Sequence, residues 1–189
     1  MSPADLVLTP LGLRFRGRRL PVSIGRGGIR RDKAEGDGAT PAGELRVIGL
    51  LYRPDRIAAA SLPPWALPIG LRDRWCDAPD HPAYNHLVTE PFGRSEERLR
   101  RGDPLYDLIL PLDWNWPDAV PGRGSAIFIH QWRRPGHPTA GCLALARADL
   151  IFVARHAPPG TRVIIRPGAA GGRRAQPSRD GSKGRAVPA

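Results

Sequence analysis

Long apolar runs are missing from this sequence. No stretch approaches the roughly 18 consecutive apolar residues of a membrane-spanning helix, so we expect no transmembrane segment. The N-terminal segment also lacks the continuous apolar stretch of about 7–15 residues that a secretory signal peptide requires, because Thr9, Pro10 and Gly12 interrupt it. A length of 189 residues with 41% hydrophobic and 25% charged positions predicts one folded domain with a sizeable core.

Cysteine is scarce as well. Two cysteines, Cys76 and Cys142, make no disulfide framework in a chain of this length. A disulfide bond between them would leave no free thiol to act as a nucleophile. Cys76 lies near His81 and His86, but these spacings match no structural zinc pattern, and the neighbouring prolines indicate turns. We therefore predict a polar insertion beside a cleft, with no metal and no other cofactor.

Lysine is almost absent, yet the formal net charge is +11 because arginine is abundant. Such a charge draws a domain toward anionic polymers. We expect no nucleic acid partner, because no recognition helix, aromatic-basic repeat or zinc finger accompanies the charge. An anionic cell wall fits the charge equally well. Residues 168–189 hold part of the charge and little apolar surface, which predicts a catalytic domain over 1–167 and a disordered basic tail over 168–189.

The residue pattern predicts a mainly β fold with one helix. Short β-branched and apolar segments alternate with glycine and proline turns, which is typical of strands. The expected strands are 6–9, 13–16, 20–24, 44–52, 105–112, 126–132 and 161–166. Residues 25–43 are expected to form a long functional loop, and 65–97 an irregular insertion. The one expected helix spans 144–156, with a Pro-Pro-Gly stop after it.

Two residues are candidates for catalysis. His130 lies at the end of a predicted buried strand, and Cys142 follows a turn of small residues. We expect Cys142 at the head of the helix, where partial positive charge and free N–H groups favour the reactive thiolate. His130 within hydrogen-bond reach would make an activated nucleophile. His137 competes as the base, but it lies in a flexible turn and a base needs a fixed aim. A small, inert buried cysteine is the alternative interpretation.

The motif Thr139-Ala140-Gly141-Cys142, preceded by the strand Ile127-Phe128-Ile129-His130, resembles the hallmark of the L,D-transpeptidase catalytic domain. The loop 33–43, with its Thr-Pro-x-Gly element, is similar to a family loop near the N-terminus. Further resemblance is carried by Tyr84-Asn85, Tyr106-Asp107 and residues 124–128. The likeness covers about residues 5–167. It implies an L,D-transpeptidase-like β-sandwich or barrel of mixed sheets with one helix after the catalytic cysteine.

The resemblance also implies the chemistry and the partner, which are peptidoglycan stem peptides. Cys142 would attack the carbonyl at the L-centre of meso-diaminopimelate in a stem tetrapeptide and release the terminal D-alanine. An amine on another stem would then take the acyl group. His130 would move the protons, and the backbone around Thr139 and Gly141 would hold the oxyanion. With water as the acceptor, the enzyme would instead be a cysteine peptidase; a non-catalytic basic wall-binding module is a third alternative.

Two positions depart from the family pattern. Mainstream members carry histidine where this chain has Ala140, and arginine where it has Ala144. The resemblance implies that this arginine binds substrate, so another residue would have to supply its charge: Arg133, Arg134 or Arg147. Trp132 would line the substrate groove beside them. The resemblance implies a place in the cell envelope or periplasm, whereas the lack of a visible signal peptide implies the cytoplasm if the start of the chain is correct.

Overall fold

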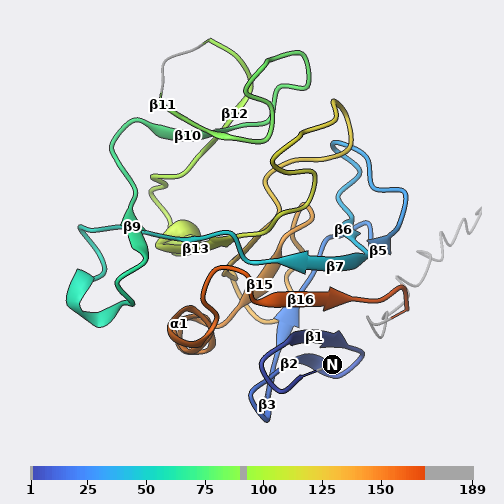
Figure 1. Ribbon diagram of the computed structural model, residues 1–189, viewed down its shortest axis with the longest axis vertical. Coiled ribbons are helices and arrows are strands. Elements are labelled where there is room, and N and C mark those ends of the chain that lie inside the picture. The colour runs from blue at the N-terminus through green and yellow to red at the C-terminus, as the bar shows by residue number, and fades with distance from the viewer. Residues whose placement is uncertain (1, 90–92, 169–189) are drawn as a thin grey trace, which may run out of the picture.

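Two β-sheets contain most of the strands in the computed structural model, which describes residues 2–89 and 93–168 (Figure 1). The larger is mixed, with the order β4-β15-β14-β13-β8-β9, and its strands are Val22–Ser23, Leu143–Leu145, Phe128–Gln131, Leu108–Pro111, Leu50–Tyr52 and Ala66–Pro68. The smaller has the order β3-β2-β1-β16-β7, with strands Arg18–Leu20, Gly12–Phe15, Leu6–Thr9, Arg162–Ile165 and Gly43–Arg46. The predicted mainly β fold of mixed sheets is confirmed; the described strands form open sheets and no closed barrel.

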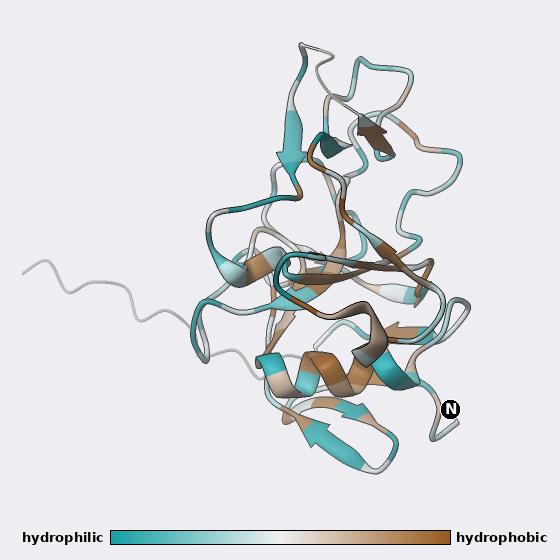
Figure 2. Cartoon of the chain, turned by 90° about the vertical axis from the view of Figure 1, so that its left-hand side faces the viewer, coloured by the Kyte–Doolittle hydropathy of each residue, from teal (hydrophilic) through white to brown (hydrophobic). Residues whose placement is uncertain are grey.

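The six-stranded sheet is buried on both faces. One face contributes Ile129 and Leu143 to a core shared with the five-stranded sheet and with helix α1, Arg147–His156. The other face contributes Phe128 and Cys142 to a second apolar cluster. Figure 2 shows hydrophobic residues concentrated in the central strands and along α1. Burial on both faces explains why the segments around Leu108–Pro111 and Phe128–Gln131 are apolar without alternation.

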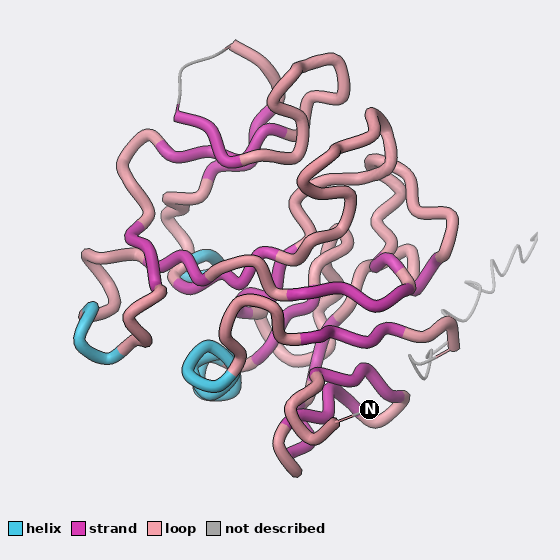
Figure 3. The backbone as a smooth tube through the Cα atoms, in the orientation of Figure 1, coloured by secondary structure: helices cyan, strands magenta, loops and turns pink. Residues whose placement is uncertain are grey.

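The segment predicted to be an irregular insertion contains more regular structure than expected. Besides β9 it forms a separate three-stranded antiparallel sheet, with the order β11-β10-β12 and strands Leu87–Thr89, Asp73–Cys76 and Glu96–Arg98. This sheet lies at the top of Figure 1, and long loops connect it to the main sheets (Figure 3). Short, charged strands have weak alternation, so their pairing could not be read from the sequence.

The loop 25–43 also carries a small element, the parallel pair β5, Ile29–Arg30, and β6, Thr40–Pro41. A bridge between Gly25 and Thr139 joins it to the segment before Cys142. Two short 3₁₀ turns, Ala59–Ser61 and Pro104–Tyr106, complete the elements. Within the described ranges, no helix has both the length and the apolar character of a membrane span. The predicted basic tail lies outside the described residues except for Gly168.

Candidate active site

The pairing of β14 with β15 brings His130 and Cys142 to the same face of the six-stranded sheet. The two strands run parallel, and His130 pairs with Ala144. Because side chains alternate along a strand, Cys142, two residues before Ala144, emerges on the same face as His130 and Phe128. Cys142 and His130 both line a cavity of about 230 Å³. The structure therefore gathers the two predicted catalytic residues at one site.

The surroundings of Cys142 stabilise a neutral thiol. Its Sγ donates to the carbonyl oxygen of Ala126 at 3.1 Å and accepts from the backbone N–H of Phe128 at 3.4 Å. Only 8% of the residue is exposed. Burial, the main cause, raises the pKa of Cys142 to about 12. The cysteine therefore rests in its protonated form.

The expectation that Cys142 begins a helix is wrong. Leu143–Leu145 forms β15, paired with β14 on one side and β4 on the other, and α1 begins only at Arg147. The apolar spacing of this segment is compatible with either element, and pairing with two strands distant in sequence decides for the strand. No helix N-terminus therefore lowers the pKa of the thiol; a backbone donor reaches the sulfur from the neighbouring strand instead.

His130 is held as a neutral imidazole of one tautomer. Its Nδ1 lies 2.7 Å from the carbonyl oxygen of Gln131, and since that oxygen only accepts, Nδ1 carries the hydrogen and Nε2 keeps a lone pair. The ring packs edge-on against Tyr106, with centroids 5.2 Å apart. Burial lowers the pKa of His130 to about 4. A neutral imidazole with a free lone pair is the form that a general base requires.

Thr139 and Gly141 shape the turn that delivers Cys142. The hydroxyl of Thr139 donates to the carbonyl oxygen of Cys142 at 2.6 Å and accepts from the N–H of Gly141 at 3.1 Å. Gly141 has φ +150°, and its carbonyl oxygen accepts from the buried hydroxyl of Thr40 at 2.7 Å. A Cβ at Gly141 would lie 2.9 Å from the carbonyl oxygen of Ala39. The Thr-Pro-x-Gly loop thus contacts the turn before Cys142 directly.

Comparison with known families identifies the domain. A family model described as the L,D-transpeptidase catalytic domain matches residues 13–165. The chain belongs to this family. L,D-transpeptidase-type enzymes modify peptidoglycan, and the matched range contains Cys142 and His130. No curated protein and no solved structure matches the chain.

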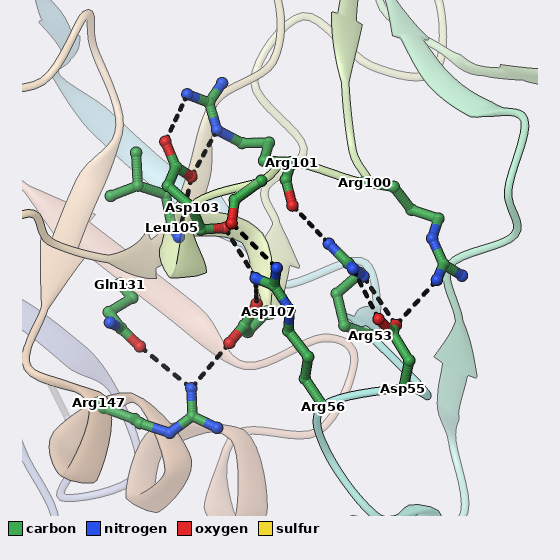
Figure 4. A network of polar contacts seen from close by, with 11 residues as sticks. Arg53, Asp55, Arg56, Arg100, Arg101, Asp103, Leu105, Asp107, Gln131 and Arg147 are labelled. Atoms are coloured by element: carbon green, nitrogen blue, oxygen red, sulfur yellow. Dashed lines mark hydrogen bonds and ion pairs between the residues drawn. The ribbon is translucent and has the colours of Figure 1, made fainter.

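The residues predicted to bind substrate in this L,D-transpeptidase domain do not all reach the cavity. Trp132 and Arg133 line it, as does His137. Arg147 instead pairs with Asp107 at 3.0 Å and lies 3.4 Å from the side-chain oxygen of Gln131 (Figure 4). Arg147 therefore joins α1 to the segment before β13, while Arg133 stays available to a ligand with 58% of its side chain exposed.

The L,D-transpeptidase cavity also contains three polar residues that sequence reasoning missed as site residues, namely Glu97, Arg101 and Tyr106. Arg101 pairs with Glu97 at 3.1 Å and with Asp103 at 2.9 Å, and its guanidinium lies 5.1 Å from the centre of the Tyr106 ring. Figure 4 shows the Arg101–Asp103 pair. Burial raises the pKa of Glu97, and it raises that of Tyr106 well above its ordinary value. Of these three residues, only Tyr106 could have been found from the sequence, because the Tyr106-Asp107 dipeptide is part of the family resemblance.

The other cysteine stands apart from this chemistry. Cys76 is a free, fully buried residue of β10, and burial raises its pKa. Its backbone N–H donates to the carbonyl oxygen of His86. Among the residues that the structure describes, no group of three or more His, Cys, Asp or Glu side chains is arranged to hold a metal ion.

Proposed function

We propose that the protein is a cysteine acyltransferase that cleaves a peptidoglycan stem tetrapeptide through a thioester on Cys142. The observation that carries the proposal is the shared cavity of Cys142 and His130, which lie on one sheet face through the pairing of β14 and β15. A thiol and a neutral imidazole of fixed tautomer that line one cavity can act as a nucleophile and its base.

The neutral pair defines the order of proton movements. The thiol hydrogen leaves the Ala126 carbonyl and passes to Nε2 of His130 as Sγ attacks the acyl carbon, so that no buried thiolate persists without a partner. The amine of the released D-alanine then takes this proton. In the second step an acceptor amine forms the new amide bond, the C–S bond breaks, and one proton from the amine returns to sulfur. The N–H of Gly141 already donates to the Thr139 hydroxyl, and the N–H of Thr139 donates to the carbonyl oxygen of Ile24. The proposed oxyanion donor in this turn is therefore the N–H of Cys142.

Mass spectrometry of the protein with a purified disaccharide tetrapeptide tests the nucleophile. We expect the mass of the acyl group, less D-alanine, on Cys142. The Cys142→Ala variant should carry no adduct, whereas Cys76→Ala should acylate normally. A folded wild-type protein that forms no adduct would support the inert wall-binding module instead. An adduct on Cys76 would overturn the assignment of Cys142 as the nucleophile.

The acceptor is tested by analysing the products. Cross-linked dimers that form in the presence of a second stem identify a transferase, as proposed. Release of tripeptide alone, at every acceptor concentration, would identify the water-dependent cysteine peptidase. The proposal also places the enzyme in the cell envelope with its substrate, and cell fractionation with an antibody checks this. Recovery in the cytosolic fraction would assign it to soluble wall fragments.

A further inference from the structure

A second cavity, of about 150 Å³, reaches Cys142 from another side. It shares Glu97, Tyr106, Ala140 and Cys142 with the first cavity, but most of its remaining lining comes from other segments. The loop 33–43 contributes one wall, and the turn after β10, which includes Asp77, contributes another. The mechanism above uses none of these walls.

Two of the charges in this second cavity are already neutralised. Lys33, with 3% of its side chain exposed, pairs with Asp37 at 2.7 Å and donates to the carbonyl oxygen of Ala34. Glu97 pairs with Arg101 at 3.1 Å. Arg26 also lines the cavity, but it is an exposed residue. The carboxylates of Glu35 and Asp77 therefore dominate the interior.

Glu35 is held in place by neutral donors. Its Oε2 accepts from the hydroxyl of Ser125 at 2.8 Å and from that of Tyr84. Its backbone N–H donates to the carbonyl oxygen of Gly122 at 2.8 Å. Burial and the Glu35 contact raise the pKa of Tyr84, which keeps that hydroxyl a donor. Hydroxyl donors orient a carboxylate without cancelling its charge, so Glu35 remains a negatively charged group in the lining of this cavity.

Asp77 supplies an independent observation. Its Oδ1 is buried, and within the described residues it has no hydrogen-bond partner. A buried carboxylate oxygen without a donor is costly, and such atoms in folded proteins call for a ligand or an ordered water. An ammonium group offers three donors and the complementary charge.

We infer that this second cavity binds an ammonium group of the substrate, with Asp77 as its counter-ion and Glu35 as a second acidic wall. The inference rests on the proposed function, because it places the ammonium in a molecule whose acyl group reacts at Cys142. Two sources share this chemistry: the side-chain amine at the third residue of the donor peptide, and the amine of the acyl acceptor.

Asp77→Asn tests the subsite, and Asp80→Asn, three residues further along and exposed, is the matched control. The donor probes are the stem tetrapeptide and the same peptide with its side-chain amine acetylated. If the donor supplies the ammonium, Asp77→Asn should lower kcat/KM of D-alanine release about tenfold for the first probe and leave the acetylated probe unchanged. If the acceptor supplies it, D-alanine release should persist while transfer to an amine-bearing stem falls about tenfold relative to hydrolysis.

Direct binding separates this inference from the proposed chemistry. Calorimetry in the Cys142→Ala background, with and without Asp77→Asn, measures affinity for the same peptides when no acyl transfer occurs. The melting temperature of Asp77→Asn should equal or exceed that of the wild type, because the change removes the charge from a carboxylate whose Oδ1 is buried without a partner. Equal effects of Asp77→Asn on charged and acetylated probes, or no effect on binding, release or transfer, would overturn the inference. If no thioester forms on Cys142 but Asp77→Asn still weakens binding of the charged peptide and not of the acetylated one, only the proposed function is overturned.

Discussion

Ala144 lies opposite His130 in the parallel pairing of β14 and β15. This relationship fixes the candidate site, because Cys142 is two residues before Ala144 and therefore on the same sheet face. It also places a methyl group on the cavity wall where the family pattern carries arginine. The face is left open, and cationic side chains reach it from elsewhere in the chain.

The protonated state of Cys142 predicts an unusual reactivity profile. Thiolate is the species that alkylates, and burial holds the pKa of Cys142 near 12. The rate of Cys142 labelling by iodoacetamide in the Cys76→Ala variant should therefore rise about tenfold per pH unit from pH 7 to 10, without a plateau. Peptide mapping by mass spectrometry measures it. A plateau below pH 8 would show a lowered pKa and contradict the neutral pair.

His130 predicts a pH dependence of stability. Its pKa is lowered by burial from 6.5 to about 4, so between these values the unfolded chain binds a proton that the folded chain does not. Stability should therefore fall as pH drops from 6.5 to 4, with a contribution from His130 of about 3 kcal/mol at pH 4. Urea unfolding should show that the free energy of unfolding falls less over this pH range for His130→Gln than for the wild type. Identical losses in the two proteins would exclude the shift.

The strands around the site were predictable, and the site's electrostatics were not. The apolar segments near Phe128–Gln131 and Leu108–Pro111 carry enough β-branched and aromatic residues to identify buried strands. The predicted helix 144–156 wrongly includes Ala144 and Leu145, which belong to β15, since a three-residue strand between two partners leaves no local signal. The raised pKa of Cys142 depends on its burial against segments distant in sequence, which spacing cannot reveal.

Gly141 is predicted to be irreplaceable for steric reasons. With φ +150°, it adopts a conformation that other residues rarely take, and a Cβ there would lie 2.9 Å from the carbonyl oxygen of Ala39. Gly141→Ala should cost about 2 kcal/mol of stability and, by displacing Cys142, lower kcat/KM about 100-fold. Gly43→Ala is the matched control, because Gly43 has φ +155° with nothing within 4 Å of the added Cβ. Equal losses in both variants would assign the effect to φ alone.

Thr40 is predicted to stabilise the turn before Cys142 from a distant loop. Its fully buried hydroxyl donates to the carbonyl oxygen of Gly141 at 2.7 Å and accepts from the N–H of Gly25 at 2.9 Å. Thr40→Val keeps the shape and leaves both groups without this partner, at a cost of about 2 kcal/mol. The melting temperature should fall by about 6 °C. Thr89→Val, at an exposed strand position, should leave it unchanged; a stable Thr40→Val would refute the role of this bond.

Arg133 and Arg147 are predicted to have different roles, although the sequence offers both as substitutes for the arginine replaced by Ala144. Arg133 lines the first cavity and is 3.9 Å from its one described ion-pair partner, Asp103, so its guanidinium can pair with a substrate carboxylate. Arg147 is occupied by Asp107, whose side chain is only 5% exposed. Arg133→Met should raise KM for the tetrapeptide about fivefold and leave the melting temperature unchanged. Arg147→Met should leave KM unchanged and cost about 1 kcal/mol, since Asp107 loses one of two arginine partners and keeps Arg56 at 2.8 Å.

Steady-state kinetics and thermal unfolding of the same two variants decide between these roles. Because each substitution removes one positive charge, a general electrostatic attraction of the anionic wall would raise KM equally in both, and that outcome would contradict the assignment. A rise in KM confined to Arg147→Met would restore it as the substitute for the arginine replaced by Ala144. The expected result is that Arg133→Met raises KM and Arg147→Met lowers stability. It would show that Arg133, just after the end of β14, supplies the positive charge on the face beside Ala144.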